Sequence, residues 1–168
     1  MKSQLFMRND NLDNLPEIVF PDNISLITHS SGMEKEWESL IESTFESFYS
    51  FEKMLINWKG YAPENVFYLV SDEKIIATAS AVENPDFEGY GWLHMVAADT
   101  KMKGMGLGKI VTLAVLHSFA KRGFKSVVLS TDDFRLPAIA TYLKSGFSPI
   151  YLDDTHEERW KKVMEKIK

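Results

Sequence analysis

The chain has 168 residues, of which 45% are hydrophobic and 12% aromatic, and its formal net charge is -5. These values indicate one globular domain spanning residues 1–168, and they argue against a disordered chain or a general nucleic-acid binder, which needs a basic surface. The absence of cysteine excludes disulfides, thiolate metal sites and a covalent acyl-cysteine route. No apolar run approaches the ~18 residues of a membrane span, and the first residues lack a signal-peptide core, so we expect a cytoplasmic protein that does not enter membranes.

The N-terminal part of the chain combines an extended start with two predicted helices. Residues 1–23 contain two prolines and several Asn and Asp, which predicts an irregular or partly extended N-terminal arm. Alternation over residues 24–29 predicts the first strand, and the Ser-x-x-Glu sequence at 31–34 has the form of a capping box. An aromatic and aliphatic stripe at helical spacing follows, made of Trp37, Leu40, Ile41, Phe45 and Phe48. This stripe predicts a helix packed on the core, whose C-terminal end could line a substrate pocket, and a short second helix is predicted over 51–58.

Three strands then follow one another with short connections. Residues 66–70 and 75–82 are the first two, joined by a polar turn, and a loop at 84–89 leads to the third at 90–98. Strands connected this closely must be antiparallel, because a parallel pair needs a crossover.

The C-terminal half supplies such a crossover. A helix over 108–122 leads to a strand at 126–130, which lies parallel to the third strand of the meander. A helix over 134–145, a strand at 147–152 and a charged helix over 156–168 complete the chain. The predicted fold class is therefore α/β, with a mixed sheet in which an antiparallel meander is followed by a parallel strand pair with flanking helices.

Three glycines separate the strand ending at residue 98 from the helix that follows, at Gly104, Gly106 and Gly108. A strand, glycine loop and helix in this order present unpaired backbone N–H groups and the positive end of a helix dipole to an anion. Glycine permits positive φ angles and lets a ligand approach the backbone closely. Lysines at positions 101, 103 and 109 add positive charge, and the alternative is a flexible turn with solvated lysines.

The spacing of these glycines excludes two common nucleotide-binding loops. A nucleotide-triphosphate P-loop would need glycine at Lys103 and Ser or Thr at Ile110. A dinucleotide fingerprint fails as well, because its third glycine would fall on Lys109 or Val111.

The stretch from Lys103 to Gly108 instead resembles the acyl-CoA pyrophosphate loop of the GNAT N-acetyltransferase superfamily, written Gln/Arg-x-x-Gly-x-Gly/Ala. Lysine stands where that family prefers Arg or Gln. A second match at the family spacing comprises Ala138, Tyr142 and Gly146. The two motifs cover about residues 90–150, and together they are a strong signal. A sequence run near residues 131–139 also resembles the acetyltransferase repeats of mycothiol synthase.

The resemblance implies the GNAT acyl-CoA N-acyltransferase fold, in which the glycine-loop strand and the next parallel strand splay apart and the pantetheine arm of acetyl-CoA fills the gap. It implies a cofactor site made largely of main-chain groups. Its residues are Val96, Ala98, Lys103, Gly104, Met105, Gly106, Leu107, Gly108, Lys109 and Arg135. The implied activity is direct transfer of acetyl from acetyl-CoA to a primary amine. The alternative is a GNAT-fold module that binds acyl-CoA without turnover, as a sensor or interaction domain.

Tyr142 is the general acid that the resemblance implies for the leaving thiolate, although a tyrosine in this helix could simply be core. His94 is the one titratable base on the glycine-loop strand, with an ordinary pKa near 6.5, and a packing histidine is the alternative. Glu83, Glu88 or Asp132 could instead act through water.

Two further side chains have competing interpretations. Asp132 and Asp133 precede a helix, so they could cap it, or Asp132 could hold a cationic substrate. Arg135 stands where the family often has Asn contacting the cofactor, and it could instead reach a phosphate or be solvated.

The acceptor is not identified by the sequence and could be a polyamine, an amino acid, an antibiotic or a protein amine. Its contacts are expected from the aromatic stripe and from the loop at 84–89. The sequence does not indicate the oligomeric state, and a homodimer is one possibility.

Overall fold

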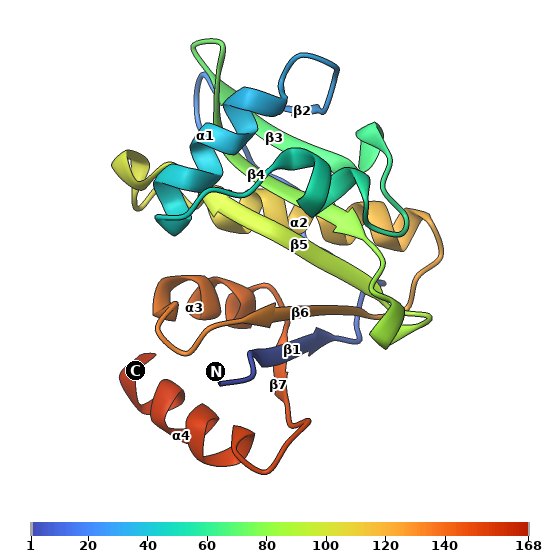
Figure 1. The fold of residues 1–168 in the computed structure, drawn as a ribbon, viewed down its shortest axis with the longest axis vertical. Helices are drawn as coiled ribbons and strands as arrows, with labels where there is room; N and C mark the ends of the chain where they lie inside the picture. Colours follow the sequence, from blue (N-terminus) through green and yellow to red (C-terminus); the bar gives the residue numbers. More distant parts are fainter. Residues whose placement is uncertain (1, 168) are drawn as a thin grey trace.

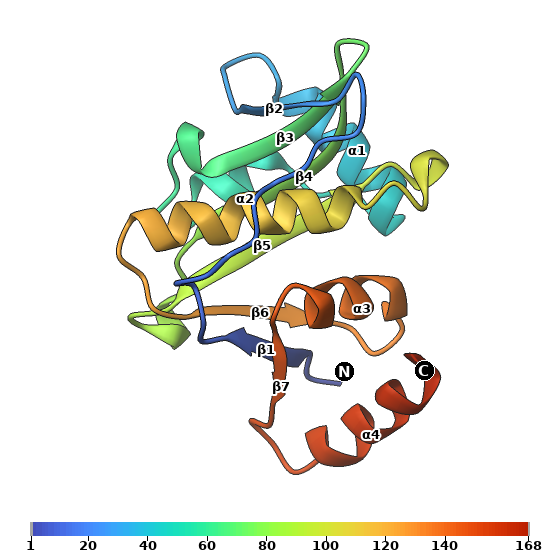
Figure 2. The same cartoon turned by 180° about the vertical axis from the view of Figure 1, so that it is seen from behind.

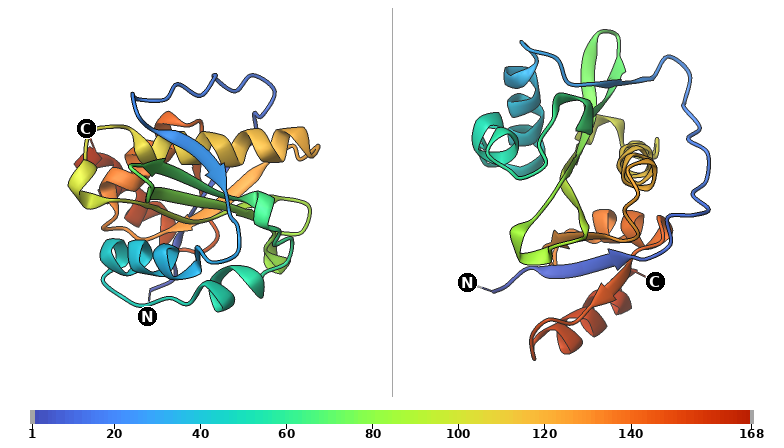
Figure 3. Two further views of the ribbon diagram at one scale, coloured as in Figure 1. Left: turned by 90° about the horizontal axis from the view of Figure 1, so that it is seen from above. Right: turned by 90° about the vertical axis from the view of Figure 1, so that its right-hand side faces the viewer.

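The computed structural model describes residues 2–167 and is organised by a seven-stranded mixed sheet in the order β2-β3-β4-β5-β6-β1-β7 (Figure 1). The strands are β1 (Leu5–Asn9), β2 (Ser25–Thr28), β3 (Val66–Ser71), β4 (Lys74–Val82), β5 (Gly91–Ala98), β6 (Val127–Thr131) and β7 (Ser148–Ile150). The helices are α1 (Glu34–Phe45), α2 (Leu107–Lys121), α3 (Leu136–Lys144) and α4 (His156–Ile167), with a π-helical turn at Glu52–Ile56. Figure 3 shows α1 and α2 on opposite faces of the sheet.

The predicted meander and parallel pair are confirmed. Strands β2 to β5 pair antiparallel, and β5 and β6 form the parallel pair. That parallel pairing is confined to Gly91 opposite Val127 and Trp92 opposite Val128, and beyond it the two strands diverge (Figure 1). Gly91 permits this closure at one end, because a Cβ there would lie 2.8 Å from the Phe119 ring of α2. The sheet is therefore joined at one end of the pair and open at the other.

Within the predicted irregular or partly extended arm over 1–23, Leu5–Asn9 form a regular strand, β1, which lies between β6 and β7. Leu5 and Met7 are fully buried there. The strand was missed because five residues carry a weak pattern and both of its partners come more than a hundred residues later in the chain.

The segment between β1 and β2 runs across the outer face of α2 (Figure 2). The Pro16 carbonyl accepts a hydrogen bond of 2.8 Å from His117 of α2, and Leu12 is buried in the same core. Helix α2 is consequently buried on most of its surface, which explains why its sequence is apolar almost throughout.

Helix α1 begins at Glu34, later than the predicted capping box. Its N-cap is Met33, which provides no side-chain cap, and the Glu34 carboxylate accepts from the Gly32 N–H at 2.8 Å. The predicted stripe packs on the sheet through Trp37 and Ile41, whereas Phe48 is 62% exposed. Among residues 2–167, no helix combines the length and apolar character needed to cross a membrane.

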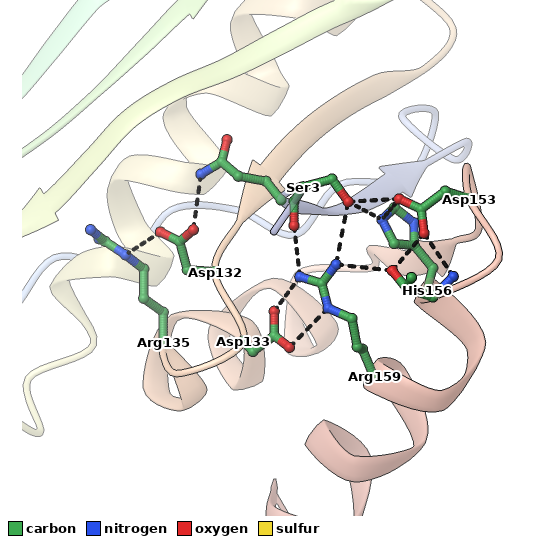
Figure 4. A network of polar contacts seen from close by, with 9 residues as sticks. Ser3, Asp132, Asp133, Arg135, Asp153, His156 and Arg159 are labelled. Carbon is green, nitrogen blue, oxygen red and sulfur yellow. Dashed lines mark hydrogen bonds and ion pairs between the residues drawn. The ribbon is translucent and has the colours of Figure 1, made fainter. Parts of the chain in front are cut away.

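A polar network fastens α4 to the rest of the domain (Figure 4). Arg159 binds Asp133 with two hydrogen bonds, and its Nη2 donates to the Ser3 carbonyl at 2.7 Å. Ser3 Oγ in turn donates to Asp153 at 2.6 Å, and Asp153 lies 3.0 Å from the ring of the fully buried His156. The network joins the N-terminal segment, the loop after β6 and α4, which are distant in sequence.

Replacing Arg159 with methionine tests the strength of this network. The change leaves the partly buried Asp133 carboxylate without its charged partner, and we expect a loss of about 2 kcal/mol in the free energy of unfolding, measured with urea. Lys162→Met, which breaks the exposed pair with Glu158, is the matched control and should have a much smaller effect. Equal effects of the two variants would contradict a special role for the network.

Candidate functional site

The gap between β5 and β6 opens into two adjoining cavities. The loop cavity, of about 500 Å³, extends from the end of β5 to the glycine loop of residues 103–108. The strand cavity, of about 230 Å³, lies between the middle of β5 and the end of β6. Val96, Arg135 and Tyr142 line both cavities. These three residues therefore mark the junction at which occupants of the two cavities would meet.

The glycine loop leaves the first turn of α2 without a side-chain cap. Gly104 and Gly106 have φ angles of 84° and 72°, and nothing lies within 4 Å of a Cβ built on either. Gly106 is the N-cap, and its carbonyl accepts the first helical hydrogen bond, from Ile110 at 3.1 Å. The N–H groups of residues 107–109 therefore lack acceptors within the helix and, with the helix dipole, favour a bound anion.

The predicted cofactor residues gather around this loop, with one exception. Those lining the loop cavity are Val96, Ala98, Lys103, Gly104, Gly106, Leu107, Gly108, Lys109 and Arg135. Met105 does not line it, and its side chain is 38% exposed.

Strand β5 carries a bulge at the junction of the two cavities. Ser80 pairs with His94 and Thr78 with Ala97, so Met95 and Val96 together face Ala79 of β4. Met95 has a φ angle of 51°, which is uncommon outside glycine. A bulge leaves ladder groups unpaired, and the β6 side of the strand is unpaired beyond Trp92. Main-chain donors and acceptors of β5 are thus exposed in the gap. One of them, the Ala98 carbonyl, accepts a long hydrogen bond of 3.4 Å from the Thr44 hydroxyl.

Tyr142 lies at the junction with its hydroxyl available. The residue is 7% exposed, and no hydrogen bond of its hydroxyl is found within residues 2–167. Burial raises the pKa of Tyr142 to about 12, against the opposing charge of Arg135. The phenol is therefore protonated at neutral pH and can donate a hydrogen bond to a group placed at the junction.

His94 lines the strand cavity in a packed setting. Its Nε2 donates to the Met54 carbonyl at 2.9 Å, and its ring lies 4.0 Å from the Trp58 ring, centroid to centroid. Burial lowers the pKa of His94 to about 4, although the Met54 carbonyl opposes this shift. The ring is neutral at pH 7 with its proton on Nε2, so Nδ1 is its basic nitrogen. These features favour the packing interpretation over a strong base.

Asp132 and Asp133 do not cap α3, so that interpretation is wrong. The helix has Arg135 at its N-cap and no side-chain cap. Asp133 is instead bound by Arg159, and Asp132 lies 3.3 Å from both Arg135 Nε and Gln4 Nε2. Asp132 lines the strand cavity.

Arg135 is also not simply solvated. Its guanidinium carbon lies 4.0 Å from the centre of the Phe45 ring, across the gap between α3 and α1. Phe45, near the C-terminal end of the aromatic stripe, and Tyr49 line the strand cavity, so the stripe borders a pocket there, which the sequence had left open beside core packing. The sequence showed no signal for Gln4 or Met54, which also line it, because their segments are brought there by β1 and the π-helical turn.

The remaining candidate residues lie away from the cleft. Glu83 pairs with Lys59 at 3.2 Å and lines neither cavity. The loop at 84–89, which includes Glu88, also lines neither cavity, so the acceptor contacts expected from this loop are not found. Within residues 2–167, no group of three or more His, Asp or Glu side chains is placed to hold a metal ion.

Comparisons with known proteins agree with this geometry. A sequence profile described as the acetyltransferase (GNAT) family matches residues 33–147. A mycothiol acetyltransferase of Thermomonospora curvata is 27% identical over 149 residues, covering 83% of this chain and 49% of the relative. The chain thus spans about half the length of the curated relatives it matches.

Solved structures share the fold. A GCN5-related N-acetyltransferase from Sphaerobacter thermophilus superposes with a TM-score of 0.72 at 22% identity, over 89% of this chain and 50% of that one. The NatC complex bound to Gag peptide and CoA contains a chain that superposes with a TM-score of 0.65 at 17% identity, over 77% of this chain and 87% of that one. With more than half of its residues matched by the family profile, the chain belongs to the GNAT acetyltransferase family.

Proposed function

We propose that this domain transfers an acetyl group from acetyl-CoA directly to the primary amine of an acceptor molecule. The observation that carries the proposal is the meeting of two cavities beside Tyr142, one ending at an uncapped helix N-terminus and the other between the splayed strands. A donor and an acceptor could then be held on either side of one reacting carbonyl.

The loop cavity fits acetyl-CoA in its chemistry. The free N–H groups of residues 107–109 would donate hydrogen bonds to the diphosphate oxygens, with Lys103 and Lys109 adding positive charge. The unpaired edge of β5 offers main-chain groups to the amides of the pantetheine arm, as an added strand would use them. Acetyl-CoA would supply the activated thioester at the junction.

The residues at the junction suit direct transfer. As the amine nitrogen bonds to the carbonyl carbon, an unpaired N–H of the bulge at Met95 and Val96 would stabilise the negative oxygen. The carbon–sulfur bond then breaks, and the Tyr142 hydroxyl would donate a hydrogen bond to the departing thiolate. The proton released by the amine leaves to water.

Loss of that proton is the demanding step. An alkyl amine with a pKa of ~10.4 is about one part in 10³ neutral at pH 7, which costs about 4.6 kcal/mol if nothing removes the proton. Asp132 lines the strand cavity and could receive it through water. We assign His94 a lesser role as a base, because its lowered pKa makes Nδ1 a weak proton acceptor.

The direct test is release of free thiol from acetyl-CoA in the presence of pooled amines, with acetyl-CoA binding measured separately by calorimetry. Thiol release that depends on an amine supports the proposal. Tight acetyl-CoA binding without transfer to any amine would instead support a sensor or interaction module. Failure to bind acetyl-CoA would contradict both.

Tyr142→Phe removes only the hydroxyl, which has no partner within the described protein. We expect kcat to fall about 100-fold, the usual scale for losing a proton donor, with the Kd for acetyl-CoA unchanged. Steady-state kinetics and calorimetry give the two values. Wild-type turnover in this variant would remove Tyr142 from the mechanism.

Gly106→Ala and Gly123→Ala form a matched pair. Both glycines have positive φ angles, 72° and 85°, and open space around a new methyl group, but Gly106 alone lines the loop cavity. Each variant should lose about 1–2 kcal/mol of stability from the left-handed backbone. We expect Gly106→Ala alone to raise the Kd for acetyl-CoA, by about 10-fold, since its methyl enters the cavity and its strain tilts the free N–H groups. Equal Kd values for acetyl-CoA in the Gly106→Ala and Gly123→Ala variants would show that the diphosphate does not bind at the glycine loop.

The lowered pKa of His94 makes stability depend on pH. Its folded-state pKa of about 4 lies below the ordinary value of 6.5, so the neutral ring's contribution is present above pH 6.5 and lost as the pH falls toward 4. Wild-type protein should lose about 2 kcal/mol between pH 7 and pH 5 through this group, and His94→Gln should lose correspondingly less. Urea unfolding at both values measures this. Identical losses would show that the ring is not excluded from water.

A further inference from the structure

Arg135 occupies the junction of the two cavities under unusual constraints. It is the N-cap residue of α3, its guanidinium carbon lies 4.0 Å from the centre of the Phe45 ring, and the centre of the Phe134 ring is 5.6 Å away. Asp132 lies 3.3 Å from its Nε. The side chain is 28% exposed, so these neighbours hold the guanidinium in the cleft and not out in solvent.

Most donors of Arg135 are nevertheless unused. Among residues 2–167, its Nε faces the Asp132 carboxylate in an ion pair of 3.3 Å that lacks hydrogen-bond geometry, and its side chain donates no hydrogen bond. Arg159 differs, since it donates to Asp133 and to the Ser3 carbonyl (Figure 4). Guanidinium donors left unpaired in a partly buried site carry a desolvation cost that a bound acceptor group would remove.

The charges facing the strand cavity indicate which chemical group would accept hydrogen bonds from Arg135. Asp132 and Arg135 are its charged residues, and His94 and Tyr142 are neutral near pH 7. A simple cationic amine would meet the positive charge of Arg135. An amine that also carries a carboxylate would match both signs, because the planar guanidinium binds a carboxylate through two parallel hydrogen bonds.

The cavity also limits the size of the acceptor. Its volume of about 230 Å³ is below the ~300–1,000 Å³ of sites for drug-sized ligands, and Phe45, Tyr49 and Trp92 give it an aromatic wall. These dimensions suit a compact molecule with an apolar side chain.

We propose that the acceptor is a small amino acid or similar amine bearing a carboxylate, and that Arg135 binds this carboxylate and determines specificity for it. The inference rests on the proposed acetyl transfer. Lys103 and Lys109 already place cations at the glycine loop, so Arg135 is not needed for the diphosphate. Phe45 and Asp132 position the guanidinium for the acceptor.

The test uses triplets of amines that differ only in the carboxylate. Each triplet consists of an amino acid, its amide and its decarboxylated amine. Three triplets are used, based on glycine, leucine and phenylalanine. We expect kcat/KM for the acid to exceed that for the amide by at least about 30-fold in one triplet, the scale of a charged hydrogen-bonded pair. The amide has the less basic amine, so a preference for the acid cannot come from amine ionisation.

Arg135→Met should bring this ratio close to one, and Arg135→Lys should give an intermediate value. Arg122→Met is the matched control, since Arg122 also stacks on phenylalanine rings, at 4.8 and 5.1 Å, but lines neither cavity. It should keep the wild-type ratio. Circular dichroism confirms that each variant is folded.

Transfer that favours the amide or the decarboxylated amine, or a preference for the acid that survives Arg135→Met, would overturn the inference while leaving acetyl transfer intact. If no acetyl transfer is detected, a second measurement still tests the inference. Calorimetry measures the binding of N-acetyl-phenylalanine, and of its amide, to the protein in the presence of CoA. Binding that requires both the carboxylate and Arg135 would support the inference even though the proposed function had failed. Binding that is indifferent to either would overturn the inference.

Discussion

The functional arrangement depends on a parallel strand pair that is hydrogen-bonded at one end only. Gly91 and Trp92 of β5 meet Val127 and Val128 of β6, and no further rungs of the ladder form. The absence of a side chain at Gly91 lets Phe119 of α2 pack against the closed end, while the bulge at Met95 bends β5 away from its neighbour. The protein thereby leaves the polar backbone of a central strand exposed, a cost that an extended ligand lying in the gap would offset.

The two halves of the cleft are held by different kinds of interaction. On the glycine-loop side the groups proposed to bind the ligand are main-chain donors at the start of α2. At the junction, by contrast, the groups are side chains that reach across the gap, with Arg135 of α3 against Phe45 of α1. Arg159 shows what the same residue type does when its role is structural, since its donors are used within the protein. Arg135, within residues 2–167, has a poorly aligned ion pair with Asp132 and no hydrogen bond from its side chain, and this difference is what supports the ligand proposed there.

Local patterns predicted most of the fold. The glycine loop, the start and end of α2 and the hairpin between β3 and β4 depend on neighbouring residues, and they lie close to where the sequence indicated. Strand β1 was not predicted, because its residues are buried only by strands that follow much later in the chain. A local pattern cannot show a partner of that kind.

The site was predictable to the same extent. Motif spacing singled out Tyr142 and the loop residues, and all of them except Met105 line the cavities. The setting of His94 depends on the Met54 carbonyl and the Trp58 ring, which belong to the π-helical turn and the segment after it. Likewise the partners of Asp133 and Arg135 come from α4 and α1, and no spacing rule along the chain reveals them.

The position of β1 between β6 and β7 has a consequence for how the domain is made. Leu5 and Met7 are synthesised well before the strands that cover them, which span residues 127–131 and 148–150. A nascent chain must therefore carry this apolar segment unpaired until β6 and β7 have been made, and its sheet cannot close until nearly the whole domain has emerged. Premature termination anywhere before β6 would yield a polypeptide with an orphaned strand, a ready substrate for chaperones and for aggregation.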